Sequence, residues 1–256
     1  MNELNFIAQQ AMYFSIPLLI VALGGMFSER SGVVNIALEG IMVMGAFTGV
    51  ATLNIIGDKI PGQWPLVIAI LVAGATGILF SLLHAFASIN MRADQTISGT
   101  ALNLFAPAFC IFVARMVQGS QNLIFNGTKF YINKVPVLGD IPVIGPMFFQ
   151  KAYITTYLGF LILILSSIVL YKTRFGLRLR ACGEHPQAAD SVGINVYKIR
   201  YSGVSISGFL AGIGGLVFIV PTSTQYSASV AGYGFLALAV LIFGQWKPKR
   251  ILVAAL

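Results

Sequence analysis

Long apolar runs, separated by polar or basic segments, occupy most of this chain. Several runs approach the length of about 20 residues that a helix needs to cross the hydrocarbon layer of a membrane. The alternation typical of a barrel strand is not found in them, so the runs predict helices. The candidate spans lie at about residues 7–27, 36–56, 66–89, 96–117, 152–171, 201–220 and 233–245. The pattern therefore predicts an all-α, polytopic membrane bundle forming a single transmembrane domain over residues 1–256.

Composition supports the membrane class. Hydrophobic residues make up 57% of the chain and charged residues only 9%, whereas a soluble domain carries about 25% charged residues. The net charge of +8 comes from residues that flank the spans. It therefore indicates topology and contact with lipid headgroups, and no nucleic-acid partner is expected. Cys110 falls in a span and Cys182 in a basic loop, so a structural disulfide between them is not expected.

Orientation follows from the basic loop at residues 172–200, because Lys and Arg resist translocation and favour the cytoplasmic side. Counting back from this loop places residues 118–151, a segment broken by prolines, on the extracytoplasmic side. The same count places the N-terminus outside. If residues 28–40 are embedded instead of forming a turn, the N-terminus moves inside, and the sequence leaves this parity open.

The end of the chain also breaks the pattern. Lys247, Lys249 and Arg250 mark another cytoplasmic turn, and a fresh apolar run then stops at Leu256. This run is too short to cross a membrane. We therefore expect seven spans, or eight in a longer protein whose C-terminal part is missing here.

A short helix is predicted inside the basic loop, at about residues 184–192. Pro186 suits the first helical position, and Gly193 suits the position just past the end. Ala188 and Ala189 would give this helix a flat face that another protein can approach closely. We interpret the helix as a docking element on the cytoplasmic side.

Two polar residues near the start of the second span are candidates for a pathway. Asn35 and Glu39 are four residues apart, so they would share one face of a helix. Ionisable residues within spans usually face a protein interior or a water-filled path. Two interpretations stay open. Asn35 could cap a helix while Glu39 forms a buried anchor between helices, or either residue could line the pathway.

A second polar group begins the fourth span, with Thr96, Ser98 and Asn103 as candidate pathway residues beside Thr100. Such groups either pack helices together or face a polar solute at membrane depth. We expect Asn35 and this group to be the neighbours of Glu39. His84 lies near a span end and is expected at the interface with water. The pairs Gly45 with Gly49 and Gly208 with Gly212 predict close helix packing.

Motifs of catalysis are missing from the sequence. It contains no G-x-x-x-x-G-K-[ST], so ATP binding through a P-loop is not expected. It offers no Cys/His cluster for a metal and no soluble stretch of about 100 residues for a catalytic domain. Its Ser and His residues form no recognisable nucleophile–base pairing. The sequence therefore predicts a protein that is not an enzyme and holds no cofactor or metal.

A family resemblance is carried by stretches that run from about residue 20 to the end. They are ERSGVVNIALEG, MGAF, QTISGTALN, TRFGLRLRACGEHPQAADSVGIN and SGFLAGIGG. Together they resemble the permease subunits of bacterial ABC importers, in the group that includes branched-chain amino acid and simple-sugar permeases. The shorter of the two permeases in nucleoside importers is the most similar of these. The basic-loop motif is the most specific of the stretches.

The resemblance implies an assembly in the cell membrane. Its other parts would be a second homologous permease, an ABC ATPase that carries the ATP and Mg²⁺, and an extracytoplasmic solute-binding lipoprotein. It also implies that the loop helix docks in a groove of the ATPase. The matching residues are Glu184, His185, Pro186, Ala188, Ala189, Asp190 and Gly193.

Three alternatives remain at this stage. The substrate could be a simple sugar or a branched-chain amino acid instead of a nucleoside. A proton-coupled secondary transporter could use Glu39 and need no ATPase, although a docking helix argues against it. A structural membrane subunit would have no pathway at all.

Overall fold

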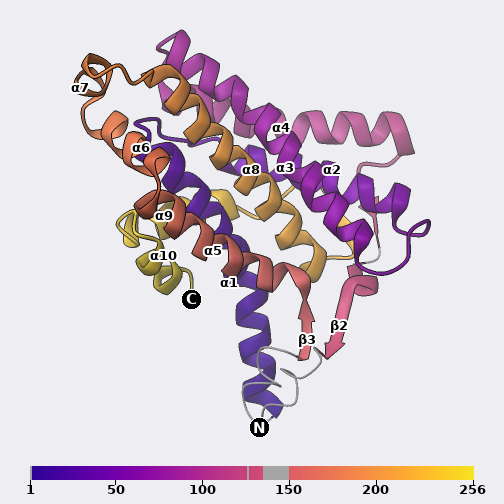
Figure 1. The fold of residues 1–256 in the computed structure, drawn as a ribbon. Helices are drawn as coiled ribbons and strands as arrows, with labels where there is room; N and C mark the ends of the chain where they lie inside the picture. The colour runs from indigo at the N-terminus through magenta and orange to yellow at the C-terminus, as the bar shows by residue number, and fades with distance from the viewer. Residues whose placement is uncertain (1, 126, 135–149) are drawn as a thin grey trace.

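The computed structural model describes residues 2–125, 127–134 and 150–256, and it is built almost entirely of helices (Figure 1). Within those residues, six helices are long and apolar enough to cross a membrane. They are α1 (Asn2–Arg30), α2 (Leu38–Ile56), α3 (Trp64–Ala85), α4 (Gln95–Gln118), α5 (Ile154–Lys172) and α8 (Val196–Thr222). A short π-helix, Phe86–Asn90, extends α3. The predicted helical membrane bundle is confirmed.

The prediction that residues 233–245 form a seventh complete crossing is wrong. Helix α9 covers Tyr233–Phe243 and has 11 residues, which gives a length of about 16 Å at 1.5 Å per residue. That is close to half of a hydrocarbon layer about 30 Å thick. The chain reaches α9 from the far end of α8 through a non-helical segment, residues 223–232, so this passage is part irregular and part helical. A tight turn leads on to α10 (Pro248–Ala255).

The core of the bundle lies around α1 and α8. In the most apolar stretch of each helix, the share of residues that are buried is 83% in α8 and 78% in α1. The corresponding share is only 22% in α4 and 33% in α5. Glycines allow α8 to pack closely on α2 and α3, because a Cβ added at Gly45 would overlap the backbone of Gly212 and one at Gly77 would overlap Gly208. The predicted close packing through small residues is confirmed at these positions. Helices α4 and α5 are left at the periphery.

One end of the bundle carries the basic loop. Helix α6 (Arg174–Glu184) and helix α7 (Pro186–Ser191) fold this loop, and α6 lies beside the last turn of α1 (Figure 1). Arg30 pairs with Glu184 at 3.7 Å, and Arg200 Nε donates to the Ser31 carbonyl at 3.3 Å. The end of α1 and the basic loop therefore share one side of the bundle.

The opposite end carries short strands. β1 (Leu123–Ile124) pairs antiparallel with β4 (Gln225–Tyr226), and β2 (Tyr131–Lys134) pairs antiparallel with β3 (Gln150–Tyr153). The N-terminus lies at this end, away from α7 (Figure 1). Part of the predicted extracytoplasmic segment, residues 126 and 135–149, lies outside the described residues. Because α1 is one uninterrupted helix between the two ends, a cytoplasmic basic loop puts the N-terminus outside.

Candidate functional site

A break in the helical backbone separates α1 from α2 at residues 31–37. Polar side chains of neighbouring helices supply hydrogen bonds to this backbone. The Val34 N–H donates to Gln95 Oε1 at 2.8 Å, and Asn103 Nδ2 donates to the Ile36 carbonyl at 2.9 Å. Asn103 Oδ1 also accepts the N–H of Gly40 at 2.8 Å. The break is thus held by side chains of α4 within the protein, a setting in which irregular backbone is tolerated at membrane depth.

His84 also supports the break. The sequence analysis placed His84 at the interface with water, and this prediction is wrong. Its side chain is fully buried, with Nε2 3.0 Å from the Val34 carbonyl and Nδ1 3.1 Å from Ser98 Oγ. A carbonyl can only accept, so the neutral ring carries its proton on Nε2 and accepts the Ser98 hydroxyl proton at Nδ1. His84 therefore connects α3, α4 and the break.

Asn35 lies within the break and not on a helix. Helix α2 begins at Leu38 and its N-cap position is Ala37, so the predicted common helical face with Glu39 is wrong, and so is a capping role for Asn35. The buried Asn35 side chain donates from Nδ2 to Ser207 Oγ of α8 at 2.9 Å. Its Oδ1 has no hydrogen-bond partner within the described residues.

Glu39 faces the interior of the subunit, where it binds the start of α9. Its carboxylate accepts the N–H of Gly232 at 2.9 Å and of Gly234 at 2.6 Å. A negative group at a helix N-terminus satisfies unpaired donors and interacts favourably with the helix dipole. The predicted direction is confirmed, but the partner is α9 and not Asn35 or the head of α4.

The polar residues at the head of α4 do not converge on one site. Asn103 and Ser98 point to the break and to His84, whereas Thr96 and Thr100 are exposed. The Thr100 hydroxyl donates back to the Thr96 carbonyl at 2.8 Å. A feature that the sequence reading missed is the N-cap Asp94, whose carboxylate accepts the N–H groups of Thr96 and Ile97. The bonds from Ile97 and Thr96 hold the pKa of Asp94 below its usual value.

The docking loop contains the expected helix. α7 begins at Pro186, and Gly193 follows it with a φ of +80°. Ala188 is exposed, whereas Ala189 is only 4% exposed and its carbonyl accepts the N–H of Ile194. The prediction that both alanines form the outward face is therefore wrong for Ala189. The role of the seven loop residues in coupling stays a prediction.

A segment that the sequence reading did not single out connects α8 to α9. We call residues 223–231 the polar segment. Its side chains alternate: Tyr226, Ala228 and Val230 are buried, and Gln225, Ser227 and Ser229 are exposed. The Tyr226 hydroxyl anchors it by donating to the Val43 carbonyl at 2.7 Å. The alternation of polar and apolar letters in QYSASV is the signal that could have found it.

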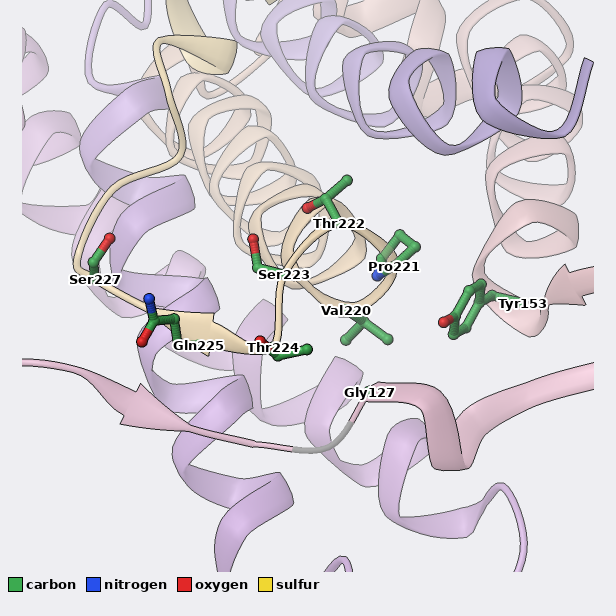
Figure 2. Close-up of a pocket in the computed structure, with 9 residues that line it drawn as sticks. All are labelled: Gly127, Tyr153, Val220, Pro221, Thr222, Ser223, Thr224, Gln225 and Ser227. Atoms are coloured by element: carbon green, nitrogen blue, oxygen red, sulfur yellow. The ribbon is translucent and has the colours of Figure 1, made fainter. Parts of the chain in front are cut away.

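A cavity of about 450 Å³ opens where the polar segment begins, at the end of the bundle that carries the strands. Figure 2 shows the residues around it, where α8 ends and β4 begins. Its lining is mainly hydroxyl, amide and backbone groups, contributed by Gly127, Tyr153, Val220, Pro221, Thr222, Ser223, Thr224, Gln225 and Ser227. A polar cavity therefore leads onto the exposed side of the polar segment.

The fold and these contacts define a class. A helical membrane protein with two interrupted crossings joined through Glu39, and with an ordered basic loop on one side, is built as a transport permease. The chain belongs to the family described as the permease component of branched-chain amino acid transport systems, whose model matches residues 7–256. It is therefore a transport component of the cell membrane and not an enzyme.

Individual relatives cover nearly the whole chain. It is 46% identical to the guanosine ABC transporter permease protein NupQ of Bacillus subtilis, over 99% of this chain and 79% of that protein. It is 44% identical to the nucleoside ABC transporter permease protein NupC of Lactococcus lactis, over 100% of this chain and 80% of that protein. Its identity to a putative glucose ABC transporter permease of Haloferax volcanii is 33%, over 93% of this chain and 70% of that protein.

Proposed function

We propose that this chain is the membrane-spanning permease subunit of an ATP-driven importer of nucleosides. The observation that carries the proposal is the identity of 46% and 44%, over essentially the entire chain, to permeases named for guanosine and for nucleosides. The relative named for glucose is more distant, at 33%, and one named as a probable branched-chain amino acid permease is at 27%. These values favour nucleosides over a sugar or an amino acid.

Coupling to an ABC ATPase is assigned to α6 and α7. Glu184, His185, Pro186, Ala188, Asp190 and Gly193 form or border the outward part of this loop, with Ala189 packed beneath them. Val192 is 73% exposed beside them and offers an apolar contact. The ion pair between Arg30 and Glu184 links the loop to α1, so a displacement of α7 by the ATPase reaches the centre of the bundle. ATP and Mg²⁺ belong to that ATPase.

A second, different permease is the proposed partner in the membrane. Lactococcus lactis has two nucleoside ABC transporter permeases to which this chain is similar, NupC at 44% and NupB at 23%. The little-buried helices α4 and α5 leave surface for such a partner and for lipid. A solute-binding lipoprotein would deliver the nucleoside at the end that carries the strands.

Transport by the complete complex tests the proposal. The complex of this chain, its partner permease and its ATPase is reconstituted in liposomes with the binding lipoprotein, and uptake of radiolabelled guanosine is measured. We expect uptake that requires ATP, persists when the proton gradient is dissipated, and is not reduced by excess glucose or leucine. Uptake that collapses with the proton gradient and ignores ATP would instead identify a secondary transporter.

The docking assignment has its own test, in which a bulky side chain is placed on the exposed Ala188. Ala188→Trp should prevent copurification of the ATPase and abolish ATP-driven uptake, because the indole fills the space that the ATPase needs. Ala93→Trp is the matched control, since Ala93 is also exposed and lies in the turn between the π-helix and α4. Normal copurification and transport by Ala188→Trp would show that α7 does not dock there.

A further inference from the structure

We propose that the polar segment, residues 223–231, forms a wall of the translocation pathway, and that its exposed side chains bind a neutral polar solute. This inference rests on the proposed function, because it names the part of the permease that the solute contacts. The segment joins the outer end of α8 to the first turn of α9, where Glu39 holds the Gly232 and Gly234 N–H groups.

Its depth in the membrane follows from α9. The inner end of α9 lies beside the end of α1, because Trp246 Nε1 donates to Glu29 Oε2 at 2.5 Å. From there, 11 helical residues rise about 16 Å, which puts Gly232 near the middle of a hydrocarbon layer about 30 Å thick. The other end of the segment pairs with β1 on the outer side. The polar segment therefore passes through the outer half of the membrane.

Lipid cannot cover such a segment, since non-helical, irregular backbone at membrane depth is stable only inside protein or along a water-filled cavity. One side is inside protein, with Val230 fully buried and Tyr226 nearly so. The other side presents Gln225, Ser227 and Ser229. By contrast, the peripheral surface of α4 is apolar, with Leu104 and Met116 more than 70% exposed. The exposed side of the polar segment therefore lines a watery space.

The side chains on that exposed face define the solute. They are hydroxyl and amide groups, which donate and accept hydrogen bonds but carry no charge. The Glu39 carboxylate at the inner end already accepts two backbone N–H groups. Such groups suit the hydroxyls of a sugar and the edges of a base, and they can offset the cost of dehydration. An amino acid zwitterion would meet no opposite charge along the segment itself.

Cysteine accessibility tests this inference in the assembled transporter. Single cysteines replace Ser227 and Ser229 on the exposed side and Val230 on the buried side. Both native cysteines are buried, so the unaltered chain gives a low baseline. A charged, membrane-impermeant thiosulfonate is then added to both sides of the liposome. We expect Ser227→Cys and Ser229→Cys to react about tenfold or more faster than Val230→Cys, because thiol reactivity depends on access to water.

A lipid-facing control completes the design, with Ile164→Cys on α5, where Ile164 is 57% exposed. It should react with a lipid-soluble maleimide but not with the charged reagent. If Ser227→Cys and Ser229→Cys behave like Ile164→Cys, the segment faces lipid and the inference is wrong. Equal labelling of Ser229→Cys and Val230→Cys would also overturn it.

Guanosine separates this inference from the proposed function. We expect saturating guanosine, delivered with the binding lipoprotein, to slow labelling of Ser229→Cys severalfold while leaving Ile164→Cys unchanged. An alternating labelling pattern in a complex that does not transport guanosine would support the pathway and refute the nucleoside assignment. Guanosine transport without the alternating pattern would support the assignment and refute the pathway.

Discussion

Two stretches of this chain leave the helical conformation at membrane depth, and they differ in what surrounds their backbone. The break at residues 31–37 is mostly buried, and side chains of α3 and α4 bind its backbone through His84, Gln95 and Asn103. The polar segment at 223–231 buries only one side and exposes hydroxyl and amide groups on the other. Irregular backbone is compatible with a membrane in both settings.

The difference shows how polar residues in a span divide between scaffold and pathway. Around the break, the side chains of His84, Gln95 and Asn103 form hydrogen bonds with the protein backbone. Along the polar segment, the outward groups face away from the core. Glu39 joins the two regions, because it lies in the first turn of α2, just after the break, and binds the N–H groups where the polar segment ends.

Removal of Glu39 should have the largest effect. Glu39→Leu leaves the N–H groups of Gly232 and Gly234 without their acceptor, at a cost of about 1–3 kcal/mol for each. Because both carboxylate oxygens accept an N–H, Glu39→Gln would turn its amide N–H₂ toward one donor and should be intermediate. Thermal unfolding of the detergent-solubilised complex measures the order. If the leucine variant is as stable as the unaltered chain, Glu39 does not hold the two regions together.

Removal of the Asn103 side chain should have the second-largest effect on stability. Asn103→Ala removes the bonds to the Ile36 carbonyl and the Gly40 N–H, so we expect a loss of about 2–4 kcal/mol of stability. Thr100→Ala, one turn away on an exposed position of the same helix, is the control and should change stability by less than about 0.5 kcal/mol. The same unfolding assay applies. If the two variants behave alike, the head of α4 is not scaffold.

The smallest effect is expected in the polar segment. Ala231 has a φ of +55°, a conformation that costs an L-residue roughly 1–2 kcal/mol and costs glycine little. Ala231→Gly should therefore leave stability unchanged or raise it by less than about 1 kcal/mol. Ala237→Gly, in the buried part of α9, should lower stability. Comparable losses in both variants would show that the backbone at Ala231 is not in this conformation.

Periodicity and length were sufficient to predict most of the fold. The six long crossings follow from apolar runs near 20 residues, and α7 follows from Pro186 and Gly193. The seventh run, placed at 233–245, matches α9 closely in its bounds, but α9 has only 11 residues and is too short to be a complete crossing. The preceding stretch, QYSASVAG, lay outside the predicted span, and its alternation of polar and apolar letters argues against a helix there.

The candidate site was harder to predict, because hydrogen-bond partners distant in sequence decide its contacts. Asn35 and Glu39 have the spacing of helical neighbours, but the helix begins at Leu38 and separates them. Glu39 is bound by glycines nearly 200 positions away, which no local pattern reveals. Ala189 likewise is covered by its own loop, so a sequence signal for small residues did not distinguish the outer face of α7 from the inner one.

The bond between Glu39 and α9 also sets where this subunit can bend. A side chain at Gly234 would overlap the backbone of Glu39, so α2 and α9 are in contact at that point without room for sliding. This close contact and the two hydrogen bonds from Gly232 and Gly234 therefore hold the starts of the two helices together. The chain is non-helical on both sides of α9, in the polar segment and in the turn at Gln245 and Trp246, and Trp246 is itself held by its bond to Glu29. We therefore expect any conformational change of this subunit to move the starts of α2 and α9 together.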